Sequence, residues 1–405
     1  MKKTRPYIPK IVVNPCSMKD DWFQTLAQTG REACNTSALA AAVSDLHGLR
    51  HRAAAGTDAD TSFDVASLTK ILCTTASLYH LASHSALSFD DRISKYLPEF
   101  GQNGKADITI RAVLGHRSGL PAWDPMFQAV VDDEETRPLF DEPAQRHPDL
   151  LHQRAKALIL HQVMGASLSH APGTRVYSDY GFIALGALIE VVTNCALDEW
   201  TRDTLFPMLG LPNMKFRRIS KHTPDADIPP TGWSRPRPPA PGQEHLYTVH
   251  TSKKQRCPGQ VDDDNAFALN GVAGHAGVFA SAPDVAQFGA HLLRELDGQR
   301  HIGNPEVLQE MIAADHGGLT PYRGLGFDHA SGPNSTAGVR MTEPSTRPTF
   351  GHLGFTGCSL WIDPNRHLSV ALLTNRVFPT RANVHGIKTF RPHFHDTLIA
   401  HIESS

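Results

Sequence analysis

Ser67 and Lys70 stand three residues apart, where a strand-like run around Phe63 gives way to a long apolar run. On a helix, residues with this spacing share one face, so the hydroxyl and the amine are expected to lie side by side. A lysine one turn away can remove or relay the serine proton, which makes the hydroxyl nucleophilic. Unpaired N–H groups at a helix start also favour developing negative charge. The pattern predicts a serine acyl hydrolase.

The Ser-x-x-Lys spacing is weak evidence by itself, because about one such match is expected by chance in a chain of 405 residues. The alternative is a surface serine beside a solvated lysine. Two later stretches supply partners. Tyr177 follows a Pro-Gly turn and precedes a helix-like run, and a phenol acts as a base where cations stabilise its anion. Residues 350–357 combine small residues with a strand start, so a substrate backbone can approach there and meet an N–H donor.

Three motifs then occur in a familiar order and rough spacing: Ser67-x-x-Lys70, Tyr177-Ser-Asp179 and His352-Leu-Gly354. With these motifs the chain resembles the serine β-lactamases and penicillin-binding proteins. The resemblance is strongest to the class C-like branch, which includes esterases and D-Ala-D-Ala carboxypeptidases. It extends over about 35–390 and includes the flanking stretches 108–121 and 271–277.

The resemblance implies catalytic roles for three side chains. Ser67 is expected to be acylated, Lys70 to help deprotonate it, and Tyr177 to act as the general base that later protonates the leaving group and activates water. The backbone N–H groups of Ser67 and Phe355 are expected to form the oxyanion hole.

Asp179, His352 and Gly354 are expected to contact the substrate, and two of them depart from the β-lactamase pattern. β-Lactamases usually carry Asn at the first position and Lys at the second. A carboxylate only accepts hydrogen bonds, and a histidine of ordinary pKa, about 6.5, is charged near pH 6 but largely neutral at pH 7. Both changes weaken recognition of a β-lactam. We therefore expect a serine hydrolase that cleaves an ester or small amide.

Two alternatives stay open. The first is a D-Ala-D-Ala carboxypeptidase, a D-amino-acid peptidase or a weak β-lactamase. The second is a non-catalytic member of the family that binds an acyl or peptidoglycan-like ligand.

Composition argues against other classes of function. The net charge of −2 gives no global attraction to nucleic acid or to an anionic membrane, and no run approaches the ~18 apolar residues of a membrane span. The basic start lacks the apolar segment of a signal peptide. We expect a cytoplasmic enzyme with a small ester, amide or peptide substrate and no nucleic-acid or membrane partner; the oligomeric state is left open.

No metal and no other cofactor is expected, because the chain has neither a Cys-x-x-Cys pair nor a His-Glu-x-x-His helix. His393 and His395 are interpreted as packing residues near the start of the last helix. Cys73 and Cys358 lie in apolar runs and are expected to be buried thiols.

Several other polar residues have a structural interpretation. His116 and His275 are expected to be packed, hydrogen-bonded loop residues rather than cleft residues. The acidic run 262–264 lacks the Gly and distal Glu of a calcium loop and is interpreted as a solvated turn or helix start. Arg376 and Arg381 are expected to form salt bridges at a strand end rather than to bind a substrate anion.

The elements that position the motifs follow from the hydrophobic pattern. Hairpins are predicted at 38–55 and 358–375, and a last amphipathic helix over about 385–402. Strands near both ends with helices between them predict one sheet built from both termini. The resemblance implies an α/β (α+β) fold of the β-lactamase type. Its central antiparallel sheet is built from N- and C-terminal segments and flanked by helices, with a large, mostly helical subdomain inserted.

The expected domain organisation is simple. Residues 1–19 form an irregular tail, and residues 20–405 form a single domain. Within it, 20–70 and 270–405 make the α/β part, and 71–269 make the mostly helical part.

Overall fold

The computed structural model describes most of the chain, namely residues 21–143, 145–211, 213–221, 225–232, 235–246, 259–313, 323–332, 334–342 and 347–404. The irregular tail expected over 1–19 lies outside the described residues.

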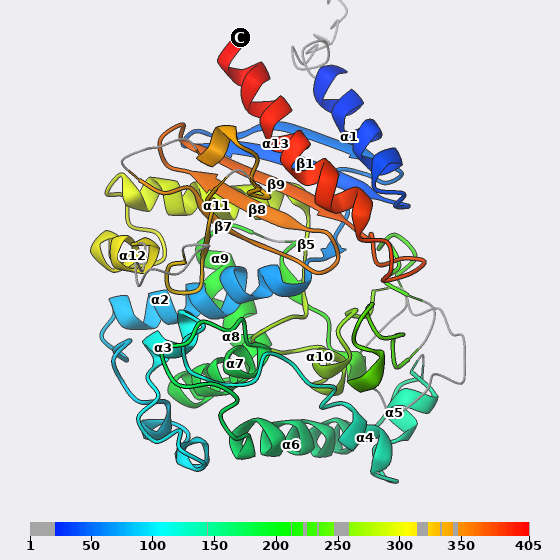
Figure 1. The fold of residues 1–405 in the computed structure, drawn as a ribbon, viewed down its shortest axis with the longest axis vertical. Coiled ribbons are helices and arrows are strands. Elements are labelled where there is room, and N and C mark those ends of the chain that lie inside the picture. The colour runs from blue at the N-terminus through cyan, green and yellow to red at the C-terminus, as the bar shows by residue number, and fades with distance from the viewer. Residues whose placement is uncertain are drawn as a thin grey trace, which may run out of the picture.

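The main sheet is antiparallel and takes its strands from both ends of the chain (Figure 1). Its order is β2-β1-β9-β8-β7-β6. The strand bounds are β1 Leu39–Asp45, β2 Gly48–Ala55, β6 Asp328–His329, β7 Phe350–Leu353, β8 Ser359–Asp363 and β9 Leu368–Thr374. β1 joins the two ends of the chain because it pairs with β9, with Leu39 opposite Thr374. Both predicted hairpins are present, and the sheet is built from the two terminal segments as expected.

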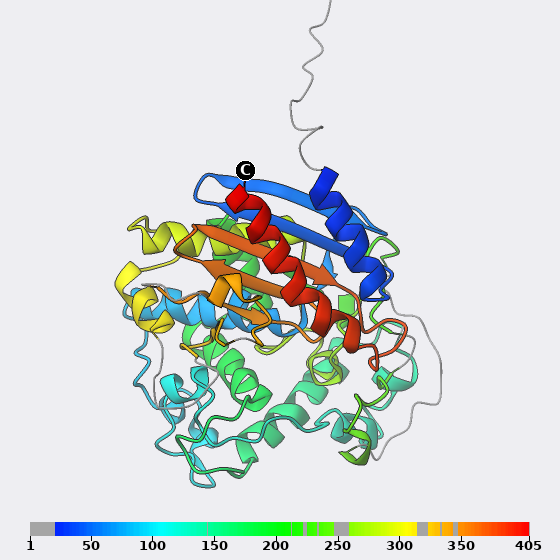
Figure 2. The same cartoon turned by 45° about the horizontal axis from the view of Figure 1, so that its top comes forward.

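The centre of this sheet is covered on both faces, which explains why β1 is apolar rather than alternating. Successive residues of a strand point to opposite faces. Ala40 and Ala42 belong to the core that includes α11 (Ala282–Leu296), while Ala41 and Val43 belong to a second core. That second core lies under α1 (Asp21–Ala33) and α13 (His385–Ser404), the two terminal helices that lie across one face of the sheet in Figure 2.

The helices between the two halves of the sheet form a layer below it in Figure 1. Their bounds, with α12, are α2 Ala76–Ser83, α3 Ile110–Leu114, α4 Gln128–Asp132, α5 Pro138–Asp141, α6 Asp149–Gly165, α7 Asp179–Thr193, α8 Leu197–Trp200, α9 Phe206–Met208, α10 Asp264–Ala268 and α12 Pro305–Ile312. α7 begins where the Ser178 side chain accepts a hydrogen bond from the N–H of Gly181, and it ends at Asn194 in the left-handed region. α6 and α7 pack against each other.

A second, three-stranded antiparallel sheet lies between the large sheet and the helices, in the order β3-β5-β4. Its strands are β3 Phe63–Asp64, β4 Lys215–Phe216 and β5 Val278–Ala280. β3 leads directly into Ser67. The small sheet therefore fixes the position of the backbone that carries the predicted nucleophile.

One continuous buried cluster joins the sheet to the helical layer, since Ala40, Leu72 and Leu185 all belong to it. The observed architecture confirms the predicted fold class, whereas the division of the chain at 70 and 270 stays a prediction. Among the described residues, no single helix is long and apolar enough to cross a bilayer. One bent pair, α7 with the segment 197–208, meets the length and composition criteria jointly across a 69° bend.

Candidate active site

Ser67 lies on a tight 3₁₀ turn, Ala66–Leu68, that follows β3. Ala66 has a positive φ of 48°, a conformation that costs a non-glycine residue about 1–2 kcal/mol. The carboxylate of Asp64 supports this turn, because it accepts hydrogen bonds from the N–H of Ala66 at 2.9 Å and from that of Asp262 at 2.6 Å. Burial raises the pKa of Asp64 to about 7 in spite of these two bonds. The nucleophile therefore sits on strained backbone held by a long-range contact.

Lys70 begins the wider helical turn Lys70–Thr75, which runs on into α2, and its side chain is fully buried. The Nζ atom lies 3.1 Å from the Oγ of Ser67, 3.2 Å from the carbonyl oxygen of His275 and 2.6 Å from Oδ1 of Asp179. Burial acts most strongly and would lower the pKa of Lys70, but the charges and hydrogen bonds of Asp179 and Tyr177 together outweigh it, so the pKa is raised. Lys70 is thus a cation at neutral pH and donates to Ser67.

Tyr177 reaches the same place from the segment before α7. The backbone on either side of it is fixed: the N–H of Val176 donates to the carbonyl of His116 at 2.9 Å, and the N–H of Ser178 donates to Nδ1 of His116 at 3.0 Å. The Nζ of Lys70 lies 4.9 Å from the centre of the Tyr177 ring. Burial raises the pKa of Tyr177; Lys70 and the Ser67 hydroxyl act in the opposite direction, and Asp179 adds to the rise. The phenol is therefore protonated at neutral pH.

The turn after β7 lies against the Ser67 segment. A Cβ atom on Gly354 would stand 2.5 Å from the carbonyl oxygen of Val65, so only glycine fits there without displacement. The hydroxyl of Thr356 also donates to the carbonyl of Asp64 at 2.8 Å. Phe355, between these two residues, lines the same cavity as Ser67. These contacts hold the turn that contains Phe355 against residues 64 and 65, which directly precede the Ser67 turn.

His352 is buried on β7 and lies next to Tyr177, with 5.9 Å between the ring centres. Its Nδ1 is 2.7 Å from the carbonyl oxygen of Leu353, and within the described chain its Nε2 has no hydrogen-bond partner. Burial lowers the pKa of His352 to about 4. The expectation that this histidine becomes charged near pH 6 is therefore wrong, because an ordinary pKa assumes exposure to water.

These residues surround a cavity of about 620 Å³. Ser67, Tyr177, Asp179, His352, Gly354 and Phe355 all line it, while Lys70 supports it from below the surface. Every predicted site residue is thus brought to one place, although their individual roles stay predictions.

The cavity also contains groups that sequence reasoning did not single out. Arg323 lines it, with its guanidinium carbon 5.3 Å from the centre of the Tyr177 ring and an ion pair of 2.6 Å to Asp328. Trp123 and Lys388 also line it. None of these residues stands in a motif, so the sequence offered no signal for them.

The two histidines given a structural role behave differently. His116 is buried and hydrogen-bonded, as expected. His275 is also buried, with Nε2 3.0 Å from Oδ1 of Asp263, but it lines the cavity and its carbonyl accepts from Lys70. The expectation that His275 is not a cleft residue is therefore wrong, because the motif that carries it packs directly against Lys70.

The acidic run 262–264 is a helix start but not a solvated one. Asp263 caps α10 by accepting from the N–H of Ala266 at 2.7 Å. Its neighbours are buried and paired: Asp264 with Arg235 at 2.6 Å, and Asp262 with Arg381 at 3.0 Å. The solvated interpretation is wrong because arginines from distant segments converge on these carboxylates.

The remaining expectations concern two arginines and two thiols. Arg381 forms the expected salt bridge, with Asp262. Arg376 instead donates from Nη1 to the carbonyl of Arg381 at 3.0 Å and from Nη2 to that of Phe355. Both arginines also line the Ser67 cavity, so their place is not confined to a strand end away from the cleft. Cys73 and Cys358 are buried free thiols, as expected. Across the described ranges, no group of three or more His, Cys, Asp or Glu side chains could hold a metal ion.

Known proteins are similar to this chain in sequence and in fold. A sequence model of the Beta-lactamase family matches residues 23–388. A protein of Escherichia coli strain K12 named "Putative D-alanyl-D-alanine carboxypeptidase" is 30% identical over 328 residues, which cover 78% of this chain and 69% of that protein.

Solved structures share the fold at lower identity. EstCE1, described as a hydrolase with promiscuous acyltransferase activity, has a TM-score of 0.64 and 21% identity over 93% of this chain and 97% of its own. An octameric penicillin-binding protein homologue from Pyrococcus abyssi also has a TM-score of 0.64, at 15% identity, over 95% of this chain and 78% of its own.

The family match spans nearly the whole chain and includes the Ser67, Tyr177 and His352 motifs. The fold and the convergence of the motif residues at one cavity agree with it. The chain belongs to the Beta-lactamase family, within the superfamily of serine β-lactamases and penicillin-binding proteins, and is a serine hydrolase.

Proposed function

We propose that this serine hydrolase cleaves an ester, or a small amide, through an acyl-enzyme formed on Ser67. The observation that carries the proposal is the convergence of the Ser67 hydroxyl, the Lys70 ammonium and Tyr177 at one cavity. A nucleophile next to a group that can take its proton is what acyl transfer requires.

The charges around Ser67 support a particular course for the proton transfers. Lys70 is held as a cation by Asp179 and already donates to the Ser67 oxygen, so it is not the base at neutral pH. Tyr177 is the base in its phenolate form, which Lys70 stabilises. Because the pKa of Tyr177 is raised, the active phenolate becomes more abundant as the pH rises.

The acylation step then balances as follows. The Ser67 oxygen bonds to the substrate carbonyl carbon as its proton passes to the Tyr177 oxygen, and the carbonyl electron pair moves onto the oxygen. The backbone N–H groups of Ser67 and Phe355 are the proposed donors to that oxyanion. When the carbonyl reforms, the bond to the leaving group breaks and Tyr177 returns the proton to it. Water repeats these steps to release the acid and free Ser67.

The preference for an ester rests on two side chains. Asp179 is engaged by Lys70, and a carboxylate offers no hydrogen-bond donor to a substrate carbonyl. His352 is neutral above about pH 4, so it supplies no fixed positive charge to a substrate carboxylate. Both features disfavour a β-lactam substrate, as expected from the sequence.

A second candidate is D-Ala-D-Ala carboxypeptidase activity, which the name of the E. coli relative suggests. Arg323 favours it, because its guanidinium lies beside Tyr177 in the cavity and could receive the terminal carboxylate of a peptide. The third reading, a non-catalytic ligand-binding member, predicts no turnover at all. The cytoplasmic location stays a prediction.

A panel of substrates separates these activities. p-Nitrophenyl acetate and butyrate, a D-Ala-D-Ala peptide and nitrocefin are compared by kcat/KM at one pH, and a fluorophosphonate is tested for a covalent adduct on Ser67. The proposal expects labelling and the highest kcat/KM for the esters. A D-Ala-D-Ala peptide preferred by about tenfold or more would select the second candidate, and absence of both turnover and labelling would select the third.

A further inference from the structure

A second cavity, of about 780 Å³, is lined by residues of β4, the edge strand of the small sheet that lies farthest from β3. It is enclosed by α8, α9 and the chain that follows them through β4, and it shares no lining residue with the Ser67 cavity. β4 pairs with β5, and β5 pairs with β3, the strand that leads to Ser67. The second cavity is therefore a separate place in the molecule and not an extension of the acyl pocket. Its volume is within the range of about 300–1,000 Å³ usual for small-ligand sites.

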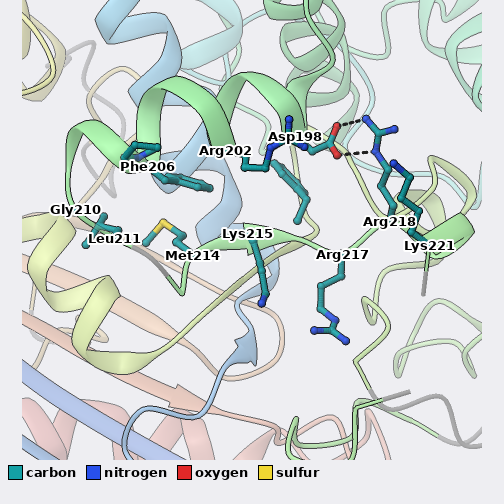
Figure 3. Close-up of a pocket in the computed structure, with 12 residues that line it drawn as sticks. Asp198, Arg202, Phe206, Gly210, Leu211, Met214, Lys215, Arg217, Arg218 and Lys221 are labelled. Carbon is teal, nitrogen blue, oxygen red and sulfur yellow. Dashed lines mark hydrogen bonds and ion pairs between the residues drawn. The ribbon is translucent and has the colours of Figure 1, made fainter. Parts of the chain in front are cut away.

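The apolar part of this cavity is contiguous. Phe206 and Pro207 come from α9, and Leu211, Met214 and Phe216 come from the segment after it. Phe206, Leu211 and Met214 are almost fully buried, so they form a packed floor, while Phe216 is partly exposed. In Figure 3, Phe206, Leu211 and Met214 lie on the left of the cavity.

The remaining wall is basic: its cations are Arg202, Lys215, Arg217, Arg218 and Lys221, against the one lining carboxylate of Asp198. Figure 3 shows Arg218 and Lys221 at the right of the cavity and Lys215 on the strand between them and the apolar floor. The arginines have carboxylate partners: Arg218 pairs with Asp198 at 2.6 Å, Arg202 with Asp203 at 2.5 Å and Arg217 with Asp225 at 3.3 Å.

Lys215 and Lys221 differ from these arginines. Both are exposed, and no carboxylate of the described residues lies within ion-pair distance of either ammonium. Unpaired cations in a cavity with an apolar floor complement a ligand with a negative head and an apolar body. We propose that this cavity binds an anionic amphiphile, a single alkyl chain with a carboxylate, sulfate or phosphate head. The chain lies on the floor formed by Phe206, Leu211 and Met214, and the head lies toward the basic wall, where Lys215 and Lys221 are the cations without a carboxylate partner among the described residues.

Decanoate is the probe that tests the proposal, with binding to the full-length protein measured by calorimetry. We expect saturable binding below about 1 mM, about tenfold weaker binding of decan-1-ol, which lacks the charge, and a similar loss for butyrate, which lacks most of the chain. The double variant Lys215→Gln, Lys221→Gln should weaken binding by about tenfold, since each exposed charge contributes modestly. Lys95→Gln is the control for loss of a surface lysine, because Lys95 is also exposed and lines neither cavity, although it is paired with Asp91 at 2.9 Å.

The NMR signal of one methionine methyl group tests where in the protein the ligand binds. With isotope-labelled methionine methyl groups, decanoate should shift the NMR signal of Met214, which Met214→Leu identifies, and leave that of Met341 in the core under α13 unmoved. Equal binding by the lysine double variant, equal binding of decan-1-ol, or a Met214 signal that does not move would each overturn the proposal.

A bilayer is the alternative source of the same head group. Binding of the protein to vesicles of phosphatidylglycerol is therefore measured as a separate experiment. Capture by vesicles that depends on Lys215 and Lys221, without binding of free decanoate, would show a surface for lipid head groups and would also overturn the proposal.

Discussion

The two cavities place charge in opposite ways. In the Ser67 cavity, the charged groups beside Tyr177 form ion pairs, Lys70 with Asp179 and Arg323 with Asp328, whereas Lys388, which also lines this cavity, is exposed. In the second cavity, Lys215 and Lys221 are exposed and unpaired among the described residues. Fixed, desolvated charges are preorganised for proton transfer and are poorly screened by salt. Exposed charges are free to meet a ligand but are strongly screened. The contrast indicates that the Ser67 cavity is suited to proton transfer and the second cavity to the binding of a ligand.

The sharpest separation of the two regions is expected from Ser67→Ala. Loss of the nucleophile should reduce ester turnover by several orders of magnitude and abolish fluorophosphonate labelling, as is common for such residues. Decanoate binding should not change, because Ser67 does not line the second cavity. Ser62→Ala is the matched control five residues upstream. Unchanged ester hydrolysis by Ser67→Ala would remove the proposed mechanism.

The next largest effect is expected from Gly354→Ala. The added Cβ would stand 2.5 Å from the carbonyl oxygen of Val65 and would push the N–H of Phe355 away from Ser67. Losing one oxyanion donor commonly costs about 10²–10³ in kcat, which kinetics with p-nitrophenyl butyrate would measure. Gly165→Ala is the control, since a Cβ there meets nothing within 4 Å. If both variants hydrolyse the ester alike, residue 355 has no part in stabilising the oxyanion.

A smaller, pH-dependent effect tests the electrostatics of the catalytic cavity. Activity should rise through the alkaline range with an optimum above roughly pH 8, because the pKa of Tyr177 is raised and its phenolate is the base. His352 has a pKa of about 4 and stays neutral throughout this range. His352→Gln should therefore leave the rising limb where it is, whereas His352→Lys adds a cation and should move it to lower pH.

The measurement is kcat/KM from about pH 5 to 10 for the three proteins, corrected for spontaneous ester hydrolysis. If the rising part of the kcat/KM profile shifted along the pH axis in His352→Gln, His352 would carry charge in the active enzyme. Superimposable profiles for His352→Lys and the unaltered protein would mean that position 352 does not tune Tyr177.

The smallest expected effect is that of salt, and it compares the two cavities directly. Raising NaCl from about 0.05 to 0.5 M shortens the screening length severalfold and should weaken decanoate binding several-fold. Hydrolysis of a neutral ester should change by less than about twofold, because Lys70 and Asp179 are shielded from the solvent. The Lys215→Gln, Lys221→Gln protein is expected to lose the salt dependence of binding. If salt changed ester hydrolysis and decanoate binding by the same factor, the two cavities would not differ in how well their charges are screened.

Much of the fold follows from local patterns. The hairpins at 38–55 and 358–375 and the helix α13 lie close to where apolar periodicity and turn residues place them. The neighbourhood of Ser67 and Lys70 is also local, since a three-residue separation on helical backbone fixes it. These features depend on residues near in sequence, which is why the sequence determines them.

Long-range packing decided the rest. The pairing of Asp179 with Lys70, the low pKa of His352 and the burial of the 262–264 carboxylates all depend on segments far apart in the chain. The second cavity likewise exists only because α9 and the chain after it fold over one another. Charge state and cavity shape depend on desolvation and on neighbours in space, and the order of residues along a chain specifies these only once the chain is folded.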